Sequence, residues 1–105
     1  MNAEIQALQK EIDIVRTRLV RANKEVDNII REIRHLHNMR EEAQASLLDT
    51  GITLSEADHK NATIDACRQV RMKTEISLAD KKNYCEKLER YHKGLLKKLA
   101  ALFTQ

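Results

Sequence analysis

The sequence predicts an all-α protein, an antiparallel hairpin of two long helices that meet along a coiled-coil seam. Three observations predict this fold. The 105 residues include no proline, two glycines, 3% aromatic and 33% charged residues, a balance typical of long solvated helices. Apolar residues follow a heptad repeat, and one strong helix-stop signal interrupts it near the middle of the chain. We therefore expect a single domain over residues 1–105, which buries only a narrow seam. Two such hairpins could pair into a four-helix bundle and bury more apolar surface.

The first helix is expected over about residues 2–48. Its apolar residues recur every 3.5 positions for about six heptads, a spacing that keeps one seam facing a partner helix as the two supercoil. The predicted a positions are Ile5, Ile12, Leu19, Val26, Ile33, Arg40 and Leu47, and the d positions are Leu8, Val15, Ala22, Ile29, Leu36 and Ala43.

The turn is expected at residues 49–53. Asp49 and Gly51 form the best stop signal, because glycine adopts the left-handed conformation that commonly ends a helix without a Cβ penalty. Thr53 and Glu56 then have the T-x-x-E spacing of a capping box, in which each side chain satisfies one free amide at a helix start.

The second helix is expected over about residues 54–103, with a weaker seam. The a positions are Ile64, Arg71, Leu78, Cys85, His92 and Leu99, and the d positions are Cys67, Thr74, Lys81, Leu88, Leu95 and Leu102. Between Arg71 and Lys81 the seam is largely polar, whereas Met72, Ile76 and Ala79 fall on outward positions. Either the frame slips locally, or this segment presents a second apolar face to another chain.

The two predicted seams match each other about the turn. An antiparallel hairpin requires a constant index sum for facing residues, and the d positions pair Leu8 with Leu95 and Val15 with Leu88. The alternative fold is a nearly continuous helix in a parallel dimer, which would tolerate Gly51 in its interior at a cost of about 1 kcal/mol.

Charged residues at three seam positions bear on partner choice. Arg40, Arg71 and Lys81 occupy a or d sites, where a charge costs stability and tends to fix register or partner. Long basic side chains can instead extend to solvent at little cost. The sequence leaves both outcomes open.

The sequence contains no convincing catalytic, metal-binding or cofactor-binding constellation, so we expect neither an enzyme nor a cofactor. Glu89 and His92 have the E-x-x-H spacing of di-iron bundles, but the motif occurs once and lacks its partner glutamates. Cys67 and Cys85 lie 18 positions apart on one helix, about 27 Å at 1.5 Å per residue, which no disulfide bridges. We expect buried thiols in a reducing compartment.

The leading hypothesis is a cytoplasmic scaffold, adaptor or stalk protein that binds another helical protein or itself. Helix faces and the hairpin tip are the candidate contact surfaces, because loops on rigid supports often carry recognition. The candidate residues are Met72, Ile76, Ala79, Leu96 and Phe103 on the helix faces, and Asp49, Gly51, Ile52 and Leu54 at the tip.

The alternative hypothesis concerns residues 87–103, which have the profile of a cationic amphipathic helix. Five basic residues stand between leucines, and the net charge of the whole chain is +3. Such a segment binds the surface of an anionic membrane. Nucleic acid is a weaker option, because the segment offers few cations and no aromatic stacking platform. No apolar run approaches the roughly 20 residues that span a bilayer, so we expect a soluble protein.

Overall fold

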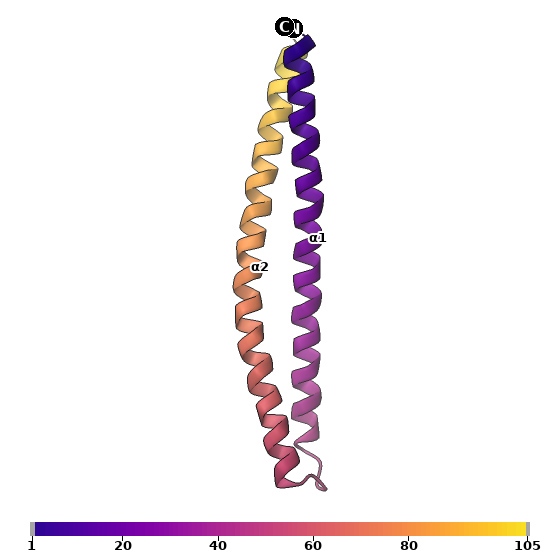
Figure 1. Ribbon diagram of the computed structural model, residues 1–105, viewed down its shortest axis with the longest axis vertical. Coiled ribbons are helices and arrows are strands. Elements are labelled where there is room, and N and C mark those ends of the chain that lie inside the picture. Colours follow the sequence, from indigo (N-terminus) through magenta and orange to yellow (C-terminus); the bar gives the residue numbers. More distant parts are fainter. Residues whose placement is uncertain (1, 105) are drawn as a thin grey trace. The chain divides into compact units, whose positions relative to one another are not determined.

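The computed structural model describes residues 2–104 and shows an all-α helical hairpin, as predicted. Helix α1 spans Asn2–Ser46 and helix α2 spans Leu54–Phe103, and one short connection joins them (Figure 1). Neither helix contains proline, and the only glycine within them is Gly94. The described residues form no strand. The chain divides into two compact units: unit 1 comprises Met1–Val26 and Asp80–Gln105, and unit 2 comprises Asp27–Ala79.

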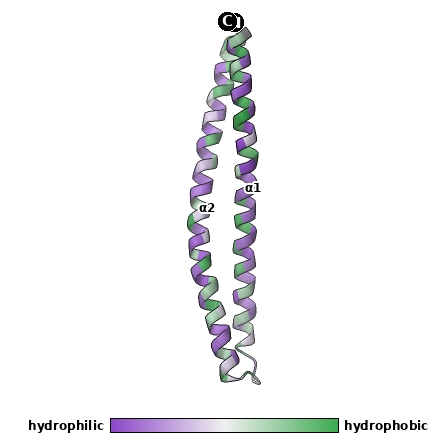
Figure 2. Ribbon diagram, in the orientation of Figure 1, coloured by the Kyte–Doolittle hydropathy of each residue, from purple (hydrophilic) through white to green (hydrophobic). Residues whose placement is uncertain are grey.

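The buried residues follow the predicted heptad frame throughout both helices. All nine buried side chains in the described part of the chain occupy a predicted a or d position. Every other predicted a or d residue is half-buried, including Arg71, Leu78 and Lys81. The predicted local slip of the frame in α2 is therefore absent, and Met72, Ile76 and Ala79 lie outside the seam. Hydrophilic residues cover most of both ribbons, with apolar residues recurring along them (Figure 2).

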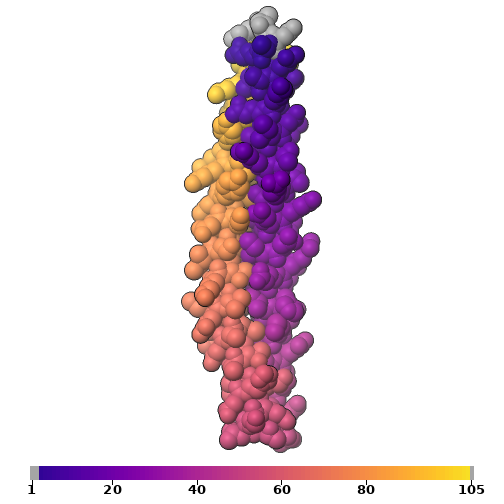
Figure 3. All heavy atoms as spheres, in the orientation of Figure 1, coloured from indigo at the N-terminus to yellow at the C-terminus, as the bar shows by residue number. Residues whose placement is uncertain are grey.

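Unit 1 holds the main apolar cluster. Ile12 and Val15 of α1 pack with Leu95 of α2, and each is nearly excluded from solvent. On the face shown in Figure 3, atoms of the two helices lie against each other in this unit. The residues packed around the cluster are all predicted seam residues: Leu8, Leu19, Leu88 and Leu99. These leucines stay half-buried, because a seam between only two helices leaves part of most of its side chains open to solvent.

Unit 2 has a thinner and more polar seam. Its buried side chains are Ala43, Ile64, Cys67 and Thr74, of which only Ile64 is large and aliphatic. The Thr74 hydroxyl donates to the Val70 carbonyl at 2.8 Å, so the buried oxygen is satisfied within its own helix. Unit 2 therefore buries less aliphatic side chain than unit 1.

The end of α1 differs from the prediction. The helix ends at Ser46 rather than near Leu48, and Gly51 does not adopt the left-handed conformation, since no described residue has a positive φ. The physical reason is a series of tight turns. The Leu48 amide donates to the Ala45 carbonyl at 3.1 Å, and the next amide donates to the Ser46 carbonyl at 3.2 Å. These bonds satisfy the last carbonyls without a left-handed residue.

A further tight turn connects the helices. The Ile52 amide donates to the Asp49 carbonyl at 3.5 Å, with Gly51 as the third residue of the turn. A negative φ at this position fits a type I turn, which accepts most residues. A Cβ atom built on Gly51 would meet nothing within 4 Å. The turn is therefore where the sequence predicts it, but it does not require glycine.

The start of α2 confirms Thr53 as its N-cap. The Thr53 hydroxyl accepts from the Glu56 amide at 3.2 Å, and the Thr53 carbonyl accepts from the Ala57 amide at 2.9 Å. The reciprocal half of the predicted capping box, from the Glu56 carboxylate to the Thr53 amide, does not form among the described residues. One hydroxyl therefore caps the helix.

Candidate interaction surfaces

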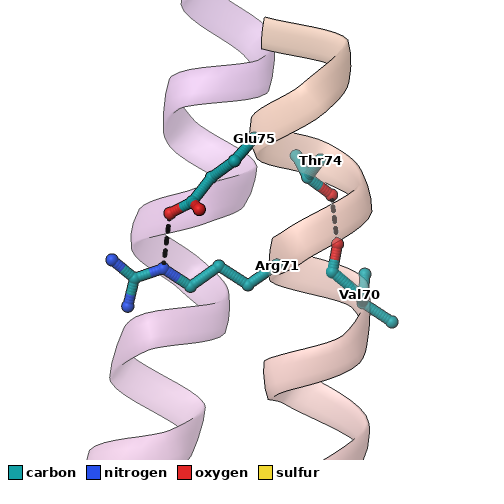
Figure 4. A network of polar contacts seen from close by, with 4 residues as sticks. All are labelled: Val70, Arg71, Thr74 and Glu75. Atoms are coloured by element: carbon teal, nitrogen blue, oxygen red, sulfur yellow. Dashed lines mark hydrogen bonds and ion pairs between the residues drawn. The ribbon is translucent and has the colours of Figure 1, made fainter. Parts of the chain in front are cut away.

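The three charged seam residues behave differently. Lys81 forms an ion pair across unit 1, with its Nζ atom 2.7 Å from Oε2 of Glu25. The hydrogen bond to Glu25, together with the charge of its carboxylate, raises the pKa of Lys81. Arg71 instead pairs with Glu75 of its own helix at 3.0 Å (Figure 4). In Arg40 the Nε atom is buried and has no hydrogen-bond partner. Of the three, only Lys81 joins the two helices.

Two further polar contacts join the helices of unit 1. The Tyr91 hydroxyl donates to the Glu11 carboxylate, and this hydrogen bond raises the pKa of the tyrosine. The Arg16 Nε atom donates to Nε2 of His92 at 3.3 Å. These contacts lie on the edges of the seam. They add directional hydrogen bonds between the helices to the non-directional apolar packing.

The outward positions of α2 in unit 2 carry an apolar stripe. Met72 is 60% exposed and Ile76 is 65% exposed, and Ala79 is exposed beside them. The spacing i, i+4, i+7 places all three on one side of the helix. We call this set the Met72 stripe. The structure thus brings together the three residues that the sequence singled out, on a surface that faces solvent.

The two apolar candidates near the end of α2 are exposed to different degrees. Leu96 is 37% exposed and Phe103 is 64% exposed. Their neighbours in the sequence, Leu95 and Leu102, belong to the seam and are buried and half-buried. The one-residue offset therefore separates core residues from surface residues on this segment.

The tip residues divide into two groups. Asp49, Gly51 and Ile52 line a small hollow, together with residues from the end of α1 and the start of α2. Leu54 does not line this hollow and is 80% exposed. Polar side chains dominate the lining: Ser46, Thr50, Glu56 and Lys60 complete it. The hollow offers hydrogen-bonding groups, and Leu54 offers an isolated apolar contact.

One surface was missed by the sequence reasoning. In unit 1, an open groove runs between the helices where the residues beside the seam are alanines. Its lining comprises Glu4, Ala7, Leu8, Glu11, Lys98, Ala101 and Leu102. The signal that could have found it is the pair Ala7 and Ala101, because both occupy the heptad position next to a d leucine. Small side chains at facing positions leave an apolar hollow.

Cys67 and Cys85 are free and buried, and burial raises the pKa of the Cys85 thiol. Across residues 2–104, no three histidine, cysteine or acidic side chains gather as a metal-binding group. Within the same part of the chain, neither helix has a stretch long and apolar enough to cross a bilayer.

Comparison with known proteins finds no family model, no curated protein and no solved structure that matches this chain.

Proposed function

We propose that this chain is a non-enzymatic coiled-coil scaffold or adaptor, which uses its helix faces to bind a second copy of itself or another helical protein. The observation that carries this proposal is the Met72 stripe. Met72 and Ile76 are more than half exposed although the heptad frame beside them is unbroken. Exposed apolar residues along one side of a helix, in addition to those packed in the seam, are typical of a surface that binds another helix.

The spacing of the stripe supports a helical partner. Residues at i, i+4 and i+7 form a ridge that fits the groove of a facing helix, as in helical bundles. Lys73 is exposed beside it and can pair with an acidic residue on that helix. Because both cysteines are free buried thiols, we propose the cytoplasm as the compartment.

Sedimentation equilibrium over a wide concentration range tests self-association. Wild-type protein should form a species heavier than the monomer, and the double variant Met72→Gln, Ile76→Gln should remain monomeric. The matched control is Ile14→Gln, Val20→Gln, which also replaces two exposed apolar residues but lies outside the stripe. Equal association in both variants would show that the stripe is not the contact surface.

A photo-crosslinking residue tests binding to another protein if all three chains are monomeric. Placed at position 72, it should form a discrete adduct in cells, whereas the same group at the exposed position of Lys24 should not. The same pattern of adducts from both positions, or none from position 72, would contradict the proposal.

A further inference from the structure

The exposed side of α2 near its end carries a second apolar strip, in unit 1. Leu88, Leu95 and Leu99 pack in the seam and are not free for another contact. Leu96, Ala100 and Phe103 remain exposed at i, i+4 and i+7, so they share one side of the helix. We call this set the Phe103 strip. It is one residue out of step with the seam, which is why the packing in unit 1 does not cover it.

Cations border the strip on both sides. Lys93 and Lys97 are exposed and lie four residues apart, in the row next to Leu96 and Ala100. On the seam side, Arg16 of α1 reaches His92 at 3.3 Å, which places a guanidinium near the strip from the other helix. The strip is therefore an apolar line between positive charges.

The surrounding surface adds one cation and little bulk. Arg90 is exposed on the outward side of α2, and Gly94 is exposed four residues further along the helix. A Cβ atom built on Gly94 would meet nothing within 4 Å, so this side of the helix is open. The lack of a side chain at Gly94, next to Lys93, lets a broad, flat surface approach the helix closely.

Acidic groups are few on this side of α2. Glu89 is the only acidic residue between residues 87 and 103, and it lies seven residues before Leu96, at the far end of the strip. Glu86 pairs with Arg90 at 3.9 Å. The charge of the segment therefore stays positive around Leu96 and Phe103.

We propose that this face binds the surface of an anionic lipid membrane, with Leu96 and Phe103 entering the headgroup region. Lysines that flank an apolar strip keep their charged ends at the headgroups while their stems cover apolar surface. Clusters of basic residues on amphipathic helices bind acidic lipids through this combination of charge and apolar contact. The exposed apolar side chains favour a membrane over nucleic acid, since phosphates give Leu96 and Phe103 no apolar environment.

Vesicle flotation tests the proposal with the full chain. Wild-type protein should float with vesicles that contain phosphatidylserine, should not float with phosphatidylcholine alone, and should lose binding at high salt. The variant Lys93→Ala, Lys97→Ala should partition about thirtyfold more weakly, as the loss of two cations near the surface implies. Leu96→Ala, Phe103→Ala should also lose binding, with an unchanged circular dichroism spectrum.

The matched control is Lys10→Ala, Lys24→Ala, which removes the same charge from exposed positions of α1. It should bind like wild type, and equal weakening would show that only net charge matters and overturn the proposal. Absence of flotation with anionic vesicles would also overturn it, as would unchanged binding by Leu96→Ala, Phe103→Ala together with equal affinity for duplex DNA. Met72→Gln, Ile76→Gln should float normally. The membrane proposal and the proposal on the Met72 stripe can therefore be disproved independently of each other.

Discussion

Leu95 and Leu96 are neighbours in the sequence with opposite surroundings. Leu95 is 3% exposed and packs with Ile12 and Val15, whereas Leu96 is 37% exposed. A rotation of 100° per residue separates their side chains, so the same residue type serves the core at one position and the surface at the next. For these two residues the heptad position, rather than hydrophobicity, decides whether the side chain packs in the core or lies at the surface.

Truncation of these two leucines should have unequal effects on stability. We expect Leu95→Ala to lower the free energy of unfolding by about 2–5 kcal/mol, the usual range for a buried leucine. Leu96→Ala should change it by less than about 1 kcal/mol, because Leu96 is already 37% exposed and lies outside the buried seam. Urea titration followed by circular dichroism measures both. Similar losses for the two variants would contradict the assigned frame.

The buried Cys85 thiol should make stability depend on alkaline pH. Burial raises its pKa in the folded chain, so the folded state holds the proton more tightly than the unfolded state. The resulting stabilisation is complete below the unfolded pKa of about 8.5 and is lost as pH rises through the folded pKa. Between pH 7.5 and 9.5, the melting temperature should therefore fall more steeply with pH for wild type than for Cys85→Ala. Parallel slopes would show that the thiol does not contribute.

At the scale of the helices, local signals were sufficient to predict most of the fold. The heptad frame and the cap at Thr53 depend on spacing along one helix, so the sequence contains them directly. The left-handed Gly51 was predicted wrongly, because tight turns from Ala45 onward satisfy the helix end first. The bond between Tyr91 and Glu11, and the groove beside Ala7, depend on how two helices approach each other. No pattern within one helix reports that distance.

Gly94 gives a prediction for α2. It lies in the helix interior, has no positive φ, and leaves space for a Cβ atom. Gly94→Ala should therefore raise the free energy of unfolding by about 1 kcal/mol, through the lower helix propensity of glycine. Gly51→Ala is a useful comparison outside the helices, where a smaller gain from the unfolded state is expected. A loss of stability in Gly94→Ala, measured by urea titration, would indicate a contact at this position in solution.

At the scale of the whole molecule, the two units differ in how their seams are built. Unit 1 has the cluster around Ile12, Val15 and Leu95, whereas unit 2 places Thr74 and Arg71 in its seam. Local opening is easier where fewer apolar contacts are buried. We therefore expect the two units to differ in local stability although the same two helices run through both.

Amide hydrogen exchange should detect this difference. Amides of residues 70–76 should exchange faster than those of residues 88–95, because opening in unit 2 disrupts fewer apolar contacts. Thr74→Val should slow exchange around position 74, since it replaces a buried hydroxyl with a methyl group and keeps the shape. Uniform protection along α2, unchanged in Thr74→Val, would show that the polar seam has no effect on local opening.

The placement of the two cysteines supplies an internal reporter for each unit. Cys85 is buried in unit 1 and Cys67 is buried in unit 2, and both are free. A thiol reagent reaches a buried cysteine only when the surrounding structure opens, so the labelling rate of each one measures opening in its own unit. In single-cysteine forms of the chain, this labelling rate would show how a membrane or a partner helix changes the opening of one unit at a time. No probe has to be attached to the chain beforehand.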